Sequence, residues 1–241
     1  MLDATPQRYS RLSPAEVAAA SKQNIHATAR GADECLLPVP SNAPRPLSPR
    51  EAVGTWPYRD ASGALLYLTH RFDNSDGKSF AWQTAWRTPS GAIGWKFRAP
   101  PSPRPIYGLD RLAALPESSV LIAEGEKAAD AATRMFPSMV TVTSPGGAEA
   151  AAKADWSALR GRRALIWPDN DAPGETYAQT VAALLAGVAS EVKIIDASAL
   201  ARTDPAGGER EPVAGWDAAD AESEWGDKAA LREALKRCVR S

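Results

Sequence analysis

The sequence has few of the residues that bind zinc. Among its 241 residues are two cysteines, Cys35 and Cys238, and two histidines, His26 and His70. The cysteines lie near opposite ends of the chain and neither belongs to a Cys-x-x-Cys pair, so no zinc-ligand spacing can be assembled. We therefore expect no structural zinc site in this protein.

Long hydrophobic runs and a strong net charge are missing as well. No apolar run approaches the roughly 18 residues that indicate a membrane span, and the N-terminus lacks the basic-then-apolar pattern of a secretory signal. We expect a cytoplasmic protein without a membrane partner. The formal net charge of -1 provides no general attraction for nucleic acid, so such binding would depend on local basic clusters.

The composition divides the chain into four segments, at 1–50, 51–116, 117–200 and 201–241. The first is expected to form a helix over residues 14–23, followed by a proline-rich linker. In the second, alternating apolar runs separated by turn residues predict a small antiparallel sheet that could contact nucleic acid. These runs cover residues 65–72, 79–84 and 92–97. The last segment contains a polar stretch and a basic helix.

The third segment alternates between strand and helix patterns. The expected strands cover residues 120–123, 140–143, 163–167 and 191–195. The expected helices cover residues 126–136, 147–153 and 173–187. Such alternation predicts parallel strands covered by helices. We therefore predict an α/β fold in which a parallel-stranded sheet flanked by helices follows the small antiparallel β-rich module and the N-terminal helix.

Acidic residues follow two of the expected strands directly. Glu124 ends the apolar run 120–123, and Asp169 and Asp171 follow the run 163–167. The carboxyl ends of parallel strands meet at one edge of a sheet, so these side chains are expected to converge. Two carboxylates two residues apart can bind a hard divalent cation such as Mg²⁺. Taken alone, Glu124 has the alternative interpretation of a solvated acid favoured by a helix dipole.

Four further residues could contact phosphate groups. Gly125 would let a phosphate approach the backbone, and Lys127 lies in the first turn of the following expected helix. Gly146 and Gly147 open another expected helix and could offer backbone amides. The alternatives are a solvated lysine and an ordinary turn.

Basic residues stand among aromatic ones in the small β-rich module. The basic residues are Lys78, Lys96, Arg98 and Arg104, and the tryptophans are Trp82, Trp86 and Trp95. Single-stranded nucleic acid is bound by this combination, because phosphates pair with cations and bases stack on rings. The alternative is that most of these tryptophans form the core of a small sheet.

The order of these blocks resembles a known domain. A Glu-Gly pair, a Gly-containing turn and an Asp-x-Asp-x-x-Gly block, each after its own strand, are similar to the Toprim domain of bacterial-type primases, topoisomerases and some nucleases. The resemblance covers about residues 117–200. Three blocks look like those of the Toprim primase-like proteins of phages, plasmids and integrated elements: 105–110, 124–130 and 215–220.

The resemblance implies a role for each acid. Glu124 would act as general acid and base, and Asp169 and Asp171 would bind one or two Mg²⁺ ions, for which Mn²⁺ can substitute. Asp217 and Asp220 would match the third acidic position, also in the metal site, although Asp217 could instead cap a helix. The implied function is a DNA primase that makes short RNA primers from nucleoside triphosphates on a single-stranded DNA template, with any replicative helicase as a separate chain.

Two other functions agree with the same residues. One is a Toprim metal-dependent nuclease, and the other is a non-catalytic nucleic-acid-binding module of a replication complex. The second is favoured by the missing zinc module, which many primases carry. A topoisomerase fits worst, because it needs a nucleophilic tyrosine, and Tyr107 or Tyr177 would more plausibly pack locally.

Overall fold

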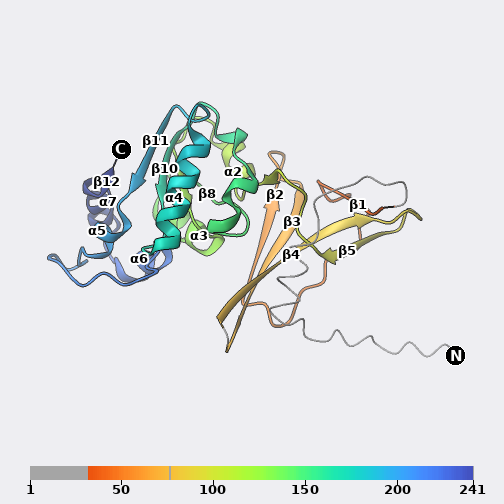
Figure 1. Ribbon diagram of the computed structural model, residues 1–241, viewed down its shortest axis with the longest axis horizontal. Helices are drawn as coiled ribbons and strands as arrows, with labels where there is room; N and C mark the ends of the chain where they lie inside the picture. The colour runs from red at the N-terminus through yellow and green to blue at the C-terminus, as the bar shows by residue number, and fades with distance from the viewer. Residues whose placement is uncertain (1–31, 76, 241) are drawn as a thin grey trace.

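The computed structural model describes residues 32–75 and 77–240, and the helix predicted over residues 14–23 lies outside them. Figure 1 shows an antiparallel sheet at one end of the molecule and a mainly parallel sheet, covered by helices, at the other. The strands are β1 Glu34–Cys35, β2 Gly54–Arg59, β3 Leu65–Asn74, β4 Gly77–Arg87, β5 Ile93–Phe97, β6 Arg104–Pro105, β7 Val120–Ala123, β8 Val140–Val142, β9 Ala154–Asp155, β10 Arg163–Trp167, β11 Glu191–Ile195 and β12 Val239–Arg240. The α-helices are α2 Leu109–Ala114, α3 Glu126–Met135, α4 Ala172–Leu185, α5 Ala197–Ala201, α6 Ala218–Glu224 and α7 Lys228–Arg237, and the 3₁₀ helices are η1 Ala148–Lys153 and η2 Ser157–Leu159.

The antiparallel sheet has the strand order β1-β4-β3-β2, with β5 also paired to β4. Its longest element is the β3–β4 hairpin, whose last register pair is Asn74 with Gly77. Gly77 has φ 118°, a left-handed conformation that glycine adopts without steric cost at a turn. The antiparallel β-rich module predicted from the sequence is therefore confirmed.

The second sheet has the strand order β12-β11-β10-β7-β8. Its strands are parallel except β12, which pairs antiparallel with β11. Alternate residues of β7 enter different cores: Val120 and Ile122 pack toward α4, whereas Leu121 and Ala123 pack toward α3, α6 and α7. Both faces of the sheet are covered, which explains why the central strand β7, Val-Leu-Ile-Ala, is a continuous apolar run.

The helices cover the two faces of this sheet as the apolar periodicity predicts. In α4, Tyr177, Val181 and Leu185 are fully buried against the sheet. In α7, Leu231 and Ala234 are buried on the opposite face. Across residues 32–75 and 77–240, no helix has the length and apolar character needed to cross a membrane.

The structure corrects two expectations about this part of the chain. The helix expected at 147–153 is the 3₁₀ helix η1, a conformation common in short connecting segments such as this one, which runs from Gly147 at φ 65° to the paired strand β9. The last segment also contributes more than a polar stretch and a basic helix. Its strand β12 extends the mixed sheet, and α6 and α7 bury Trp216, Trp225 and Leu231 in the same core as β7.

Candidate active site

The predicted acids leave neighbouring strands at the same edge of the mixed sheet. Ala123, the last residue of β7, is the register partner of Trp167, the last residue of β10. Glu124 follows the first strand directly, and Asp169 follows the second after one proline. Strand pairing therefore places Glu124 beside the loop that carries Asp169 and Asp171.

The loop after β10 is tightly constrained. Asp171 is the N-cap of α4, and its side chain accepts a hydrogen bond of 2.7 Å from the Gly174 backbone N–H. A Cβ atom at Gly174 would collide with the backbone carbonyl of Asp169. Glycine at this position thus lets the first turn of α4 close against the Asp169 backbone.

The C-terminal segment reaches the same loop through hydrogen bonds to Asn170. The Asn170 N–H donates to the Trp216 carbonyl at 2.9 Å, and the Gly215 N–H donates to the Asn170 carbonyl at 2.9 Å. The Asn170 side-chain amide donates to the Val213 carbonyl at 2.7 Å. Trp216 is 1% exposed, and its ring centroid lies 6.3 Å from that of Trp167. This docking brings the next residue, Asp217, to the other acids.

Asp217 and Asp220 also form the start of α6. The Asp217 carboxylate accepts hydrogen bonds from the N–H groups of Ala219 and Asp220, and the Asp220 carboxylate accepts one from the Asp217 N–H. This reciprocal arrangement is a capping box. Both bonds to Asp217 end on Oδ1, so Oδ2 takes no part in it. Asp217 is therefore the N-cap of α6, as the alternative interpretation predicted, and its charge also raises the pKa of Glu124 and of Asp169.

Glu124, Asp169, Asp171 and Asp217 form what we term the acidic cluster. Burial raises the pKa of Asp169 to about 8, and the charges of the other three acids add to this shift. Burial likewise raises the pKa of Glu124, to which the charges of Asp171 and Asp217 contribute. Oε2 of Glu124 is buried and has no hydrogen-bond partner among the described residues. Ionising all four acids is therefore unfavourable in the folded protein, because its own groups do not fully compensate the negative charge.

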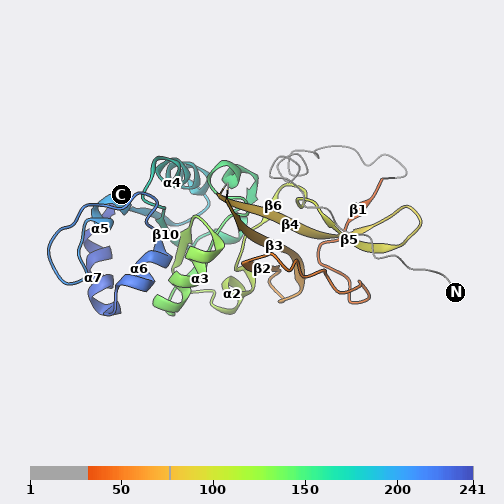
Figure 2. The ribbon, with the colours of Figure 1, turned by 90° about the horizontal axis from the view of Figure 1, so that it is seen from below.

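A lysine from the antiparallel sheet partly offsets this charge. Lys78 is exposed near the tip of the β3–β4 hairpin, and its charge lowers the pKa of both Glu124 and Asp169. In Figure 2 the hairpin runs toward the mixed sheet and its helices. The two sheets thus contribute opposite charges to one site.

The acidic cluster fits a hard divalent cation in chemistry, although it is not a preformed cage. Within residues 32–75 and 77–240, no three His, Cys, Asp or Glu side chains are arranged tightly enough to hold an ion. Mg²⁺ prefers carboxylate oxygens and usually keeps several waters, so it does not need a complete protein cage. The unpartnered Oε2 of Glu124 and the carboxylate-only donor set agree with such an ion.

The glycines predicted to contact phosphate differ in their surroundings. Gly125 is the N-cap of α3 with φ -142°, and a Cβ atom there would meet nothing within 4 Å. Lys127 is exposed in the first turn of α3. A Cβ atom at Gly146 would lie 3.0 Å from the Trp82 ring, whereas Gly147 faces open space. Packing against Trp82 is therefore sufficient to explain a glycine at position 146.

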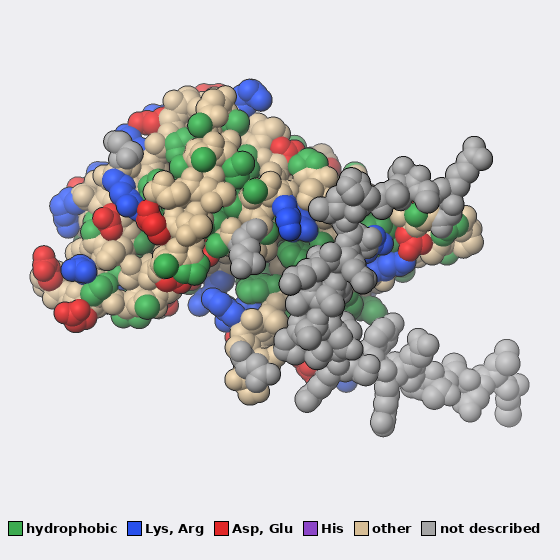
Figure 3. All heavy atoms as spheres, in the orientation of Figure 1, with side chains coloured by type: hydrophobic (Ala, Val, Ile, Leu, Met, Phe, Trp, Pro, Cys, Tyr) green, Lys and Arg blue, Asp and Glu red, His purple; other side chains and the backbone are tan. Residues whose placement is uncertain are grey.

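The other predicted basic residues, Lys96 in β5, Arg98 just after it and Arg104 in β6, have partners inside the fold. Lys96 forms an ion pair with Asp33. The Arg98 guanidinium lies over the Trp86 ring, 4.0 Å from its centroid, and Arg104 is 7% exposed. Figure 3 shows basic and acidic side chains interspersed over the mixed-sheet end of the visible face. Of the basic residues that we predicted, Lys78 is the one whose charge acts on the acidic cluster.

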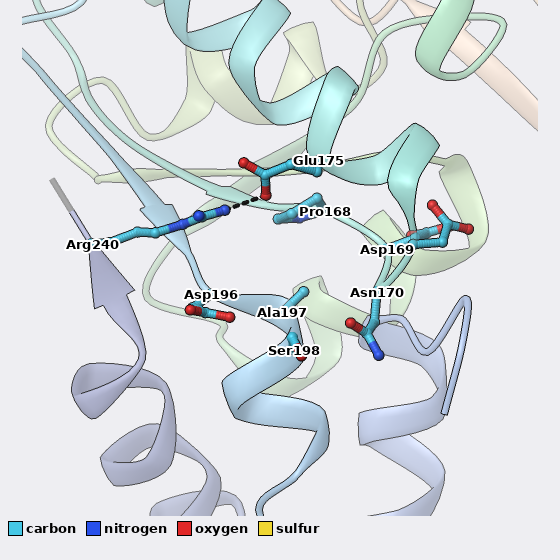
Figure 4. Close-up of a pocket in the computed structure, with 9 residues that line it drawn as sticks. Pro168, Asp169, Asn170, Glu175, Asp196, Ala197, Ser198 and Arg240 are labelled. Carbon is cyan, nitrogen blue, oxygen red and sulfur yellow. Dashed lines mark hydrogen bonds and ion pairs between the residues drawn. The ribbon is translucent and has the colours of Figure 1, made fainter. Parts of the chain in front are cut away.

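A pocket of about 240 Å³ borders the acidic cluster and includes residues that the sequence analysis missed. Besides the 168–171 loop it is lined by Glu175, Asp196, Ala197, Ser198 and Arg240. Figure 4 shows Arg240 reaching Glu175, with which it forms an ion pair. Asp196 directly follows strand β11, just as Glu124 directly follows β7, so its place after an expected strand could have identified it. Arg240 gave no comparable signal, because its position depends on β12 joining the sheet.

Comparisons by sequence found no relatives. No protein-family model matches the chain. No curated protein matches it either.

Solved structures of DNA primases are similar to this chain. A DNA primase domain from Pseudomonas aeruginosa has a TM-score of 0.50 and 14% identity, with 77% of this chain and 51% of that chain covered. The primase of Aquifex aeolicus, with its zinc-binding and RNA polymerase domains, has a TM-score of 0.45 and 18% identity, covering 76% and 39%. A DnaG primase catalytic domain bound to single-stranded DNA has a TM-score of 0.45 and 14% identity, covering 76% and 50%.

The likeness to the Pseudomonas domain shows the fold. This chain has the mixed α/β fold of a primase catalytic core, with the smaller antiparallel sheet attached. The chain spans about half the length of that domain. At this identity, the chemistry has to be argued from the acidic cluster itself.

The raised pKa of Asp169 predicts how stability depends on pH without divalent ions. Its value of about 8 exceeds the ordinary 3.8, so the folded protein binds more protons than the unfolded chain between these values. The free energy of unfolding should therefore fall as pH rises through this window. We expect Asp169→Asn to be more stable than the parent at pH 8, by more than about 1 kcal/mol, and to lose this advantage at pH 4.

Thermal unfolding in EDTA at several pH values measures this difference. Glu117→Gln, an exposed acid outside the cluster, is the control and should not change the pH dependence. Mg²⁺ should reduce the gap by stabilising the parent alone. Equal pH profiles for Asp169→Asn and the parent would contradict the buried repulsion inferred for the cluster.

A second prediction concerns the close approach at Gly174. Gly174→Ala should displace the Asp169 backbone, lower the free energy of unfolding by about 1–3 kcal/mol, and weaken Mg²⁺ binding at least about tenfold. Calorimetric titration with Mg²⁺ and thermal unfolding measure the two effects. Gly125→Ala is the control: it has open space and an ordinary φ, so it should affect stability little. Unchanged Mg²⁺ affinity in Gly174→Ala would show that the loop geometry does not control the site.

Proposed function

We propose that this chain is a Toprim-type DNA primase, which synthesises short RNA primers on single-stranded DNA with Mg²⁺. The observation that carries the proposal is the acidic cluster, assembled from three separate chain segments at one sheet edge and faced by Lys78. The primase-core fold supports it. The three sequence blocks further support a member of the group found in phages, plasmids and integrated elements.

The residues of the acidic cluster would have two different roles in phosphoryl transfer: ion binding and proton transfer. Asp169, Asp171 and Asp217 would hold one or two Mg²⁺ ions, with Mn²⁺ as a substitute. A bound ion supplies positive charge that neutralises phosphate oxygens. Glu124 would accept the proton of the attacking hydroxyl, and burial has already raised the pKa of its carboxyl.

Residues around the cluster would bind the substrate. Lys78 would contact the phosphates of the nucleoside triphosphate from the side opposite the acids. Gly125 and Lys127 border the site with open space that a phosphate or template backbone could enter. A replicative helicase is a further proposed partner.

A primer-synthesis assay tests this function. With labelled ribonucleotides, single-stranded DNA and Mg²⁺ or Mn²⁺, the parent should form template-dependent products of a few nucleotides. Glu124→Gln should lower the rate by about 10²–10⁴, because it removes the proton acceptor, while single-stranded DNA binding is kept. Degradation of DNA without nucleotides would indicate a nuclease instead. Activity that Glu124→Gln leaves unchanged would refute the role of the cluster.

Lys78 gives a prediction on substrate affinity. Lys78→Met should raise the dissociation constant of a Mg²⁺–nucleoside triphosphate about tenfold or more, because a hydrogen bond to a charged group is worth about 1.5–3 kcal/mol. Lys96→Met removes the same charge from the same sheet, but Lys96 is paired with Asp33, so a change below about twofold is expected. Fluorescent-nucleotide titration measures both variants. Equal losses in the two would point to a general field effect rather than a contact.

A further inference from the structure

Two acids of the 124–130 block point away from the acidic cluster. Glu126 and Asp130 are four residues apart in α3, so they share one face of that helix. This face meets the antiparallel sheet. Neither side chain is explained by the proposed metal site.

Glu126 is buried against strand β2 of the antiparallel sheet. It is 5% exposed, and its Oε1 accepts a hydrogen bond of 2.8 Å from the Tyr58 hydroxyl. Tyr58 belongs to β2, is fully buried, and stacks on Tyr67 of β3 with ring centroids 4.3 Å apart. The carboxylate thus binds a tyrosine that is itself fixed in the core of the sheet.

Asp130 binds the same region one turn later. Its Oδ2 accepts a hydrogen bond of 2.9 Å from the Trp56 indole, and its Oδ1 accepts one of 2.9 Å from the Tyr107 hydroxyl. Arg111 lies 3.7 Å from the same Oδ1. Both oxygens therefore have partners, unlike Oε2 of Glu124.

We propose that Glu126 and Asp130 are positioning residues, which hold β2 against α3 and thereby hold Lys78 beside the acidic cluster. We call their bonds to Tyr58 and Trp56 the latch. The proposed effect on Lys78 rests on the proposed function. The proposed attachment of β2 to α3 does not.

The strand pairing shows how the latch can affect the position of Lys78 in the β3–β4 hairpin. Tyr58 is the register partner of Tyr67 in β3, and Lys78 of β4 is the register partner of Asp73 farther along β3. Side chains and backbone hydrogen bonds therefore connect the latch continuously to the hairpin. The start of α3 also links Glu126 to Glu124 through a single glycine. Loss of the latch should let the hairpin move relative to the acidic cluster.

A pair of isosteric substitutions separates positioning from ion binding. Gln at position 126 can still accept the Tyr58 hydrogen bond through its amide oxygen. Glu126→Gln should therefore keep the Mg²⁺ affinity within about twofold, while Asp169→Asn loses about tenfold or more in titrations with Mg²⁺ alone. A loss in Glu126→Gln equal to that in Asp169→Asn would make Glu126 an ion ligand and overturn the proposal.

Tyr58→Phe breaks the latch from the other side without changing any acid. Amide hydrogen exchange of β2 and of the β3–β4 hairpin should become about tenfold faster, while β10 and α4 keep their protection. Asp130→Ala removes the acceptor of the Trp56 N–H and should have the same effect. Glu222→Gln is the control, since it breaks the contact of Arg134 on α3 with α6 and should leave the hairpin unchanged. Unchanged exchange in both latch variants would refute the latch.

A double-mutant cycle tests the action through Lys78. Tyr58→Phe and Lys78→Met should each weaken binding of a Mg²⁺–nucleoside triphosphate about tenfold, and the double variant should bind no more weakly than Lys78→Met alone. Multiplied losses of about a hundredfold would show independent effects and refute the coupling. If the parent binds no nucleotide, the proposed function fails, and the latch is then judged by the hydrogen exchange and the Mg²⁺ titrations.

Discussion

The partial burial of Glu124 and Asp169 beside two further acids is the constraint on which the rest of this site depends. Removing charged groups from water is unfavourable, and placing like charges together adds to the penalty. The high pKa of Asp169 expresses this cost directly. The fold offsets it with apolar burial of Trp216, with hydrogen bonds on Asn170, and with the glycine that lets α4 close on the loop. Repulsion among the ionised carboxylates favours binding of a cation, because the positive charge of the ion offsets their negative charges.

The antiparallel sheet also affects the charge balance of the acidic cluster, although it is separate from the mixed sheet that carries the acids. Its hairpin brings Lys78 near the acids, which is the protein's own partial counter-charge. Other basic residues of the sheet serve the fold: Lys96 is paired with Asp33, and Arg98 lies over Trp86. The buried Tyr58–Glu126 contact then joins the sheet to the helix that begins after Glu124. The site thus combines a lysine from the antiparallel sheet with carboxylates from the mixed sheet.

Local pattern in the sequence predicted most of the mixed sheet correctly. The strands predicted at 120–123, 163–167 and 191–195 match β7, β10 and β11, since short segments rich in Val, Ile and Leu between helical patterns are typical of parallel strands. The segment at 147–153 failed as an α-helix because alanine content reports helix propensity, whereas neighbouring pairing decided its conformation. Strand β12 was not predictable, because two residues carry no periodicity.

Some features of the candidate site were likewise predictable from the sequence, and others were not. The sequence alone determined which residues carry charge and that Glu124 and Asp169 follow strands, because strand pattern and residue type are local properties. Only the tertiary structure decided that Asp217, while capping α6 together with Asp220, adds its charge to that of Glu124 and Asp169. It also decided that the charge of Lys78 acts on these acids while Arg104 is buried. These outcomes depend on packing between segments far apart in the chain, such as Trp216 against Trp167, and no local pattern encodes such contacts.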